Sequence, residues 1–202
     1  MTAVSPTPSI ARSGPTCCGL RMTAEEFFRI PEDGYDYELI DGVVVVSPSP
    51  TPRHQFISGE IYRQLADYAE KTKVGLVLFE TDVQLGRKSD GKDLVYCPEV
   101  LFIRAERVAQ IKDRIVGPPD LMVEVVSSAS RSLDSETKKN DYEQFGVGEY
   151  WLIDPEREAM AFYRLEDGRF LEVRASGDDF STHAVPGFKL DLARIRKTFR
   201  PW

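Results

Sequence analysis

Residues 117–128, GPPDLMVEVVSS, constrain the fold more than any other part of the chain. Pro118 and Pro119 end whatever element precedes them, because proline fixes φ and lacks a backbone N–H donor. The next six residues, 121–126, are apolar except for Glu124. An apolar run of this length between turn residues predicts a strand that is buried on both faces, in the middle of a sheet covered by helices.

Glu124 needs an explanation in such a strand. A buried carboxylate is costly unless a cation or hydrogen-bond donors meet it, so we expect Glu124 to face a partner or to hold a metal ion. Upstream, Pro98 and Glu99 followed by the apolar residues 100–103 repeat the pattern of proline, carboxylate and strand. The alternative is that each glutamate lies solvated at a strand end. This alternative is stronger for Glu99, which directly follows a proline.

Lys138 is the most informative basic residue. On a helix predicted over residues 132–145, Lys138, Tyr142 and Phe145 have the spacing i, i+4, i+7 and share one face. The two large side chains should face the sheet, so Lys138 should point inward or to the rim. Asp134, one turn earlier, offers the alternative of a surface ion pair. The start of this helix next to the central strand makes the two alternatives about equal.

The remaining patterns predict an α/β protein with a mixed β-sheet flanked by helices. Strands 121–126 and 150–154 enclose a helix and should be parallel through a right-handed crossover. The other expected elements are a capped helix from Thr23 to about Ile30, a hairpin of 35–40 and 43–46 around Asp41-Gly42, a helix over 53–71, one or two strands within 75–85, a strand over 99–103, a helix over 104–114, and a hairpin of 159–164 and 170–174.

The length of 202 residues is typical of one domain. Residues 1–21 are rich in Ser, Thr and Pro without periodicity, so we expect a disordered extension rather than a signal peptide. Residues 22–202 should form a single domain. Met1 and Met22 both remain candidates for the natural start.

A net charge of −7 argues against binding nucleic acid through the bulk charge of the surface. A local basic groove could be lined by Arg104, Arg107, Lys112 and Arg114, although a solvated helix face is the better explanation of this run. Three cysteines without a C-x-x-C spacing argue against a zinc site and fit a reducing cytoplasm. No apolar run is long enough to cross a bilayer.

Two carboxylates on neighbouring strands and an inward lysine suit one particular chemistry. Mg²⁺ prefers oxygen ligands and keeps waters that a phosphate substrate can replace. A bound ion of this kind activates water, and a nearby lysine offsets the charge that develops on a phosphoryl group. Motifs for a P-loop, a dinucleotide-binding loop or a serine nucleophile elbow are missing from the sequence.

Several short motifs follow one another in a fixed order between residues 22 and 195. They are YELIDG at 37–42, SPSP at 47–50 with His54, PEV at 98–100, PPDLMVEVVS at 118–127, Asp134 with Lys138 and Tyr142, and GVGEYWLIDP at 146–155. Each motif is weak alone, but the ordered set is specific. Together they resemble the Uma-two family, a family of proposed restriction endonucleases in the PD-(D/E)XK nuclease superfamily.

The resemblance implies a restriction-endonuclease-like fold and DNA phosphodiester cleavage that depends on Mg²⁺, with Mn²⁺ as the alternative ion. Glu99 occupies the place of the first-motif aspartate and Glu124 that of the second-motif acid, so both are the implied metal ligands. The lysine usual two residues later is replaced by Val126, and Lys138 fits a lysine moved to the next helix. Glu38 matches an early acidic residue that serves as an extra ligand or orienter.

One departure supports a competing hypothesis. Glu99 is one methylene longer than the usual aspartate, which would displace its carboxylate in the cleft. The alternative is therefore a catalytically inactive binding or interaction module with a nuclease fold. For the active enzyme, a homodimer could cut both DNA strands, with edge strands and Tyr150-Trp151 as candidate contact surfaces.

Overall fold

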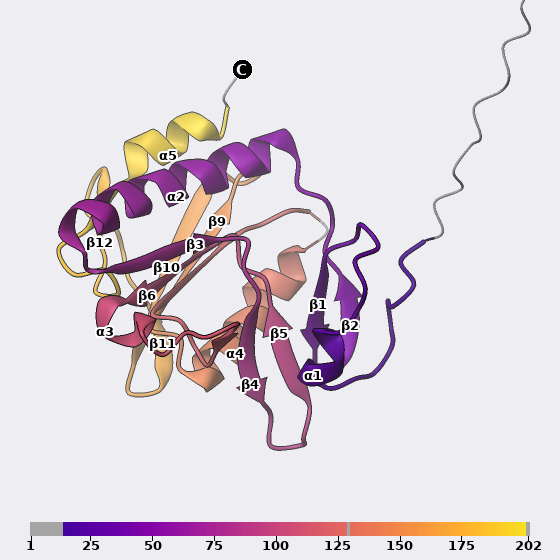
Figure 1. Ribbon diagram of the computed structural model, residues 1–202. Coiled ribbons are helices and arrows are strands. Elements are labelled where there is room, and N and C mark those ends of the chain that lie inside the picture. Colours follow the sequence, from indigo (N-terminus) through magenta and orange to yellow (C-terminus); the bar gives the residue numbers. More distant parts are fainter. Residues whose placement is uncertain (1–13, 129, 201–202) are drawn as a thin grey trace, which may run out of the picture.

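The structure, a computed structural model, describes residues 14–128 and 130–200 and contains two main β-sheets (Figure 1). The six-stranded sheet has the order β11-β10-β9-β8-β6-β3. Its strands are β3 (Gly75–Phe79), β6 (Val100–Arg104), β8 (Leu121–Val125), β9 (Glu149–Asp154), β10 (Ala159–Glu166) and β11 (Arg169–Glu172). β8 lies between β9, to which it is parallel, and β6, to which it is antiparallel. The predicted central strand and its parallel neighbour are confirmed.

The five-stranded sheet has the order β2-β1-β5-β4-β7. Its strands are β1 (Tyr37–Ile40), β2 (Val43–Val46), β4 (Val83–Arg87), β5 (Asp93–Tyr96) and β7 (Ile115–Val116). The β1–β2 hairpin turns at Asp41 and Gly42, which both have positive φ as an Asp-Gly hairpin turn requires. A small third sheet pairs β12 (Asp179–Ser181) with β13 (Lys189–Asp191).

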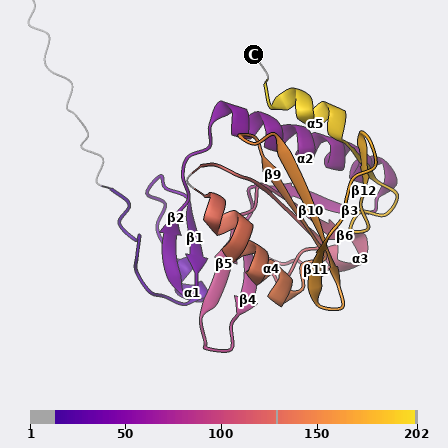
Figure 2. The ribbon, with the colours of Figure 1, turned by 180° about the vertical axis from the view of Figure 1, so that it is seen from behind.

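The helices cover both faces of the six-stranded sheet. The helical segments are α1 (Ala24–Phe27), which packs against the five-stranded sheet instead, α2 (Pro52–Thr72), α3 (Ala105–Val108), η1 (Leu133–Lys138), α4 (Lys139–Phe145) and α5 (Leu192–Thr198). α2 and α5 lie side by side over one face (Figure 1), and α4 lies over the other (Figure 2). This arrangement is the predicted mixed α/β architecture.

Alternation along β8 divides the core into two layers. Leu121, Val123 and Val125 pack with the apolar residues of α2 and α5. Met122 faces the opposite side, where it packs with Tyr142 of α4 and with residues of the five-stranded sheet. Because side chains alternate along a strand, Glu124 belongs to the same face as Met122. It therefore points toward the space between the six-stranded sheet, α4 and the five-stranded sheet.

Several predicted elements differ from the structure. The helix expected over 104–114 is confined to the single turn of α3, and the helix expected over 132–145 begins as η1, a turn of π-helix. β5 and the C-terminal elements from β12 onward were not predicted. Their short runs of three to seven residues carry too little periodicity to identify.

The proposed contact surface needs correction, and part of the N-terminal extension contacts β2. Within the segment 1–21, where we expected a disordered extension, Gly19 and Leu20 form backbone hydrogen bonds with Val44 of β2; residues 1–13 lie outside the described residues. Tyr150 and Trp151 are completely buried in β9. They cannot form a surface for a second subunit, because Trp151 packs in the core layer with α2 and α5 and Tyr150 packs in the opposite layer with Tyr142 of α4.

Gly148, directly before β9, offers a test of the close packing of β8 and β9. A Cβ at this position would lie 2.7 Å from the backbone oxygen of Asp120. We expect Gly148→Ala to lower the free energy of unfolding by about 1–3 kcal/mol, because β8 and β9 must move apart where their pairing begins. Urea unfolding measures this difference.

Gly59→Ala is the matched control. Gly59 lies inside α2, and a Cβ there would meet no atom within 4 Å. Alanine should stabilise this helix by about 0.5–1 kcal/mol. Equal effects of the two substitutions would contradict the packing argument.

Candidate active site

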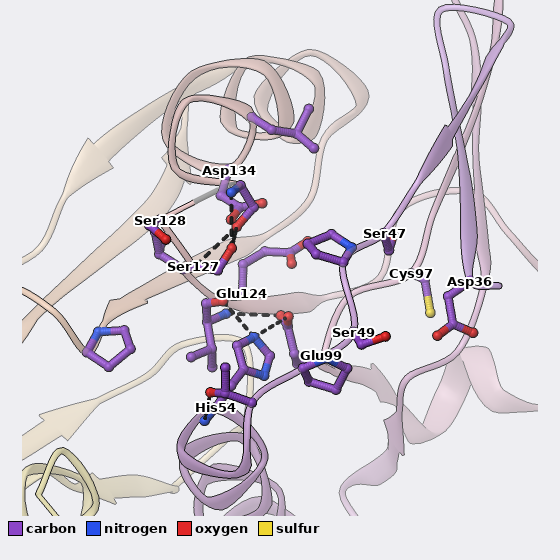
Figure 3. A pocket seen from close by; sticks show the side chains of 18 of the residues that line it. Asp36, Ser47, Ser49, His54, Cys97, Glu99, Glu124, Ser127, Ser128 and Asp134 are labelled. Atoms are coloured by element: carbon purple, nitrogen blue, oxygen red, sulfur yellow. Dashed lines mark hydrogen bonds and ion pairs between the residues drawn. The ribbon is translucent and has the colours of Figure 1, made fainter. Parts of the chain in front are cut away.

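Glu99 and Glu124 are cross-strand neighbours. The antiparallel register of β6 and β8 pairs Val100 with Val123, and its continuation sets Glu99 opposite Glu124. Residues directly opposite one another on antiparallel strands point to the same face. The two carboxyl groups therefore meet at the ends of their strands, as Figure 3 shows.

Glu124 is 1% exposed and receives two hydrogen bonds on one oxygen. Its Oε1 accepts from Nζ of Lys138 at 3.0 Å and from the hydroxyl of Tyr142 at 2.6 Å. Both donors come from the η1–α4 segment that crosses this face of the sheet. Since both reach Oε1, they fix the orientation of the carboxyl group and leave Oε2 to face elsewhere.

Lys138 points inward, and its ammonium group is enclosed by carboxylates. Nζ lies 2.9 Å from Glu38, 3.0 Å from Glu124 and 3.6 Å from Asp134. The alternative of a surface pair between Asp134 and Lys138 is wrong, because both side chains are buried. The π-helical turn η1 ends at Lys138. Such turns widen the helix locally and often occur at functional sites.

Glu38 reaches the same cluster from the other sheet. Although it belongs to the β1–β2 hairpin, its side chain is only 3% exposed. Its Oε1 accepts a hydrogen bond from the backbone N–H of Cys97 at 3.0 Å in addition to the contact with Lys138. Glu38 therefore lies where it orients the lysine.

Both oxygens of Glu99 are held by hydrogen bonds (Figure 3). Oε2 accepts from the backbone N–H of Val125 at 3.0 Å, and Oε1 lies 3.0 Å from Nε2 of His54. His54 belongs to the first turn of α2, which begins after the N-cap Thr51. The longer side chain of glutamate is thus turned back toward β8 and α2.

The pKa shifts reflect a surplus of buried negative charge. Burial raises the pKa of Glu124 well above its ordinary value; Lys138 opposes this shift and neighbouring carboxylates reinforce it. Burial also raises the pKa of Glu99, but contacts with His54, Glu124 and Lys138 outweigh it and lower the pKa overall. Burial favours neutral Lys138, but the surrounding carboxylates raise its pKa well above the ordinary value, so it is charged. The pair favours a protonated Glu124 beside an ionised Glu99.

A cavity of about 560 Å³ opens over this cluster (Figure 3). Its walls are the 46–51 connector, the first turn of α2, the end of β8 with residues 127, 128 and 130, and η1. Its acidic lining residues are Asp36, Glu38, Glu80, Glu99, Glu124, Asp134 and Glu156, and its basic ones are Arg53, His54 and Lys138.

The carboxylates of Glu99 and Glu124 are candidate ligands for a divalent ion. Among the described residues, no three His, Cys, Asp or Glu side chains form a ready metal cage. Mg²⁺ does not require one, since one or two carboxylates with waters and substrate phosphates suffice. Glu99 and Glu124 supply two adjacent carboxylates, and the unbalanced negative charge favours a cation beside them. The residues present therefore fit Mg²⁺ or Mn²⁺.

Lys138 lies at the cavity as predicted, but the candidate basic groove of residues 104–114 does not. Arg104 and Arg107 pair with Asp120, and no residue of the 104–114 run is among the described residues that line the cavity. Arg53, which does line it, was not identified. The hydroxyl of Tyr142 was also missed, because its helical spacing identified only an apolar face.

None of the helices in the described segments is long and apolar enough to span a bilayer.

Comparison with known proteins gives a consistent result at two levels. Residues 24–193 match the family model Uma2, described as "Putative restriction endonuclease". A solved structure, of a "putative nuclease belonging to DUF820" from Anabaena variabilis ATCC 29413, matches with a TM-score of 0.72 and 17% identity. The match covers 88% of this chain and 99% of that one. No curated protein matches the chain.

Removal of the buried ammonium group should be strongly destabilising. Lys138→Met leaves ionisable carboxyl groups buried without their cation, which costs about 3–5 kcal/mol in comparable cases. Urea unfolding in EDTA measures the loss. Lys139→Met is the control, because Lys139 lies over the ring of Tyr163 rather than among carboxylates. A double variant with Glu124→Gln should recover part of the loss, and equal stabilities of the two lysine variants would refute the buried cluster.

Asp134 should make stability depend on pH in an unusual direction. Burial raises its pKa to about 6, whereas an unfolded aspartate titrates near about 3.9. Between these values the folded state holds a proton that the unfolded state lacks, so stability falls as pH rises from about 4 to about 6. The loss is about 3 kcal/mol. The unfolding free energy of the parent should fall by this amount relative to that of Asp134→Asn, which cannot titrate at this position, and a constant difference between the two would contradict the shift.

Proposed function

Because the chain belongs to the Uma2 family, described as "Putative restriction endonuclease", we propose that it is a Mg²⁺-dependent endonuclease that hydrolyses DNA phosphodiester bonds. The observation that carries the proposal is the convergence of Glu99, Glu124 and Lys138 at one cavity. The three residues come from two neighbouring strands and the following helix. This combination suits phosphodiester hydrolysis because it joins oxygen ligands for a hard cation to a fixed positive charge.

Glu99 and Glu124 would hold the ion, and Mn²⁺ could replace Mg²⁺. When bound, the metal supplies Lewis-acid chemistry: it lowers the pKa of a water molecule and offsets charge on a phosphoryl oxygen. His54 and the Val125 N–H keep the Glu99 carboxylate in place. Tyr142 and Lys138 do the same for Glu124 from the opposite side.

Lys138 provides the second component of the chemistry. Its ammonium group lies beside Glu124, where it can orient the attacking water and offset the negative charge that develops on the phosphate. Glu38 accepts from the same ammonium group and therefore acts as an orienter of Lys138. A site fixed before the substrate arrives loses little free energy to reorganisation during the reaction.

The acidic lining favours a second candidate, a nuclease fold that binds without cleaving. Seven carboxylic acids face the cavity, and Glu99 stands where an aspartate is usual. Such a module would bind no metal ion at this site and would leave phosphodiester bonds uncut. Cutting of both strands by a homodimer remains a prediction.

Cleavage assays separate the two candidates. We expect the parent to nick supercoiled plasmid in Mg²⁺ or Mn²⁺, and Glu124→Gln and Glu99→Gln to lose at least about 100-fold in rate, since even groups that only orient metal ligands contribute 10–100-fold. Glutamine resembles the protonated carboxyl group that burial favours at Glu124, so this variant should fold.

Glu70→Gln is the matched control, because Glu70 is an exposed residue of α2 that does not line the cavity. It should cleave at the parental rate. A folded parent that neither cuts plasmid nor binds Mn²⁺ in calorimetry would refute the enzyme and support the binding module.

A further inference from the structure

The cavity has a problem of charge if a polynucleotide is to enter it. Each nucleotide brings a negative phosphate, and the lining contains seven carboxylic acids. Lys138 is already engaged by Glu38, Glu124 and Asp134. Positive charge for phosphates other than the one being cleaved must therefore come from another residue.

Arg53 differs from the other arginines near the cavity. It lies in the first turn of α2 and lines the cavity beside His54. Arg131, by contrast, is neutralised by ion pairs with Asp154 and Glu156. Arg53 forms no ion pair with any of the residues that the structure describes. Its positive charge is thus available to a ligand.

The guanidinium group of Arg53 also has unused hydrogen-bonding capacity. One terminal nitrogen donates to the backbone oxygen of Pro155, at the turn after β9. Nε is buried and has no partner among the described residues. A guanidinium carries five N–H donors in a planar fork that matches two oxygens of a phosphate. At least one donor is left without a partner.

We propose that Arg53 is a substrate-binding residue that holds a backbone phosphate next to the one being cleaved. The proposal rests on the proposed function, because it requires a polynucleotide in the cavity. His54 contacts Glu99, whereas Arg53 reaches Pro155, so the two consecutive residues mark two sides of the cavity. A strand whose reacting phosphate lies at Glu99 and Glu124 extends past Arg53 toward Pro155.

A purely structural role for Arg53 makes different predictions. A tether between α2 and the turn after β9 needs only a hydrogen-bond donor for Pro155, whereas a phosphate contact needs the charge. Arg53→Gln keeps an amide donor and removes the charge. Arg53→Lys keeps the charge and removes the fork. Arg157→Gln is the matched control, because Arg157 is an exposed residue of the same turn that does not line the cavity.

The test measures binding of a fluorescein-labelled DNA oligonucleotide by anisotropy, with Ca²⁺ as the divalent ion, over a range of salt concentrations. We expect Arg53→Gln to raise Kd about tenfold, the effect of losing one charge-assisted contact. The slope of log Kd against log salt concentration should decrease by about one, the contribution of a single phosphate contact. Arg53→Lys should lose less, and Arg157→Gln should bind as the parent does.

The outcomes separate this proposal from the nuclease proposal. If Arg53→Gln and Arg157→Gln bind DNA equally well, Arg53 is a tether and its role in binding is refuted, even when the parent cleaves plasmid. If Arg53→Gln and Arg53→Lys lose the same amount of DNA affinity and both unfold at a lower temperature, the role of Arg53 in binding is refuted as well. DNA binding that depends on Arg53 without any cleavage supports this proposal and refutes catalysis. A folded parent that binds no DNA refutes both.

Discussion

The ammonium group of Lys138 is the interaction on which the rest of the site depends. It contacts Glu38 on β1 and Glu124 on β8, and it lies near Asp134 within its own helix. One cation therefore joins both sheets and η1. Buried ion pairs add little net stability relative to a well-packed apolar core, because desolvation offsets most of the attraction. Such a cluster is better explained by the chemistry it supports than by the fold it stabilises.

The cluster nevertheless leaves negative charge unbalanced. Burial raises the pKa of Glu124, whereas at Glu99 burial is outweighed by contacts with His54, Glu124 and Lys138 that lower the pKa, so the two carboxyl groups have opposite shifts. A hard cation beside the two groups would offset the same surplus of negative charge. The same surplus would repel a polyanion, so action on DNA requires cations at the cavity that offset the repulsion.

The sequence determines the centre of the fold well and its edges poorly. The apolar run around Glu124 identified β8, and the crossover rule identified its parallel neighbour β9. Helical spacing was sufficient to turn Lys138 inward. The burial of Glu38 could not be predicted, because alternation in a hairpin cannot reveal that a second sheet and a helix will cover it. The π-helical turn of η1 and the contact between Arg53 and Pro155 are likewise set by tertiary packing, which leaves no local pattern.

The segment that runs along β2 has a consequence for the whole molecule. β2 consists of four consecutive valines, and both backbone groups of Val44 are paired with residues 19 and 20. An open edge of this composition is a template for pairing with other chains. A shortened protein that begins at Met22 would keep its catalytic candidates and lose this protective border. Such a protein would then be limited by aggregation through the exposed edge of β2 and not by loss of its site residues.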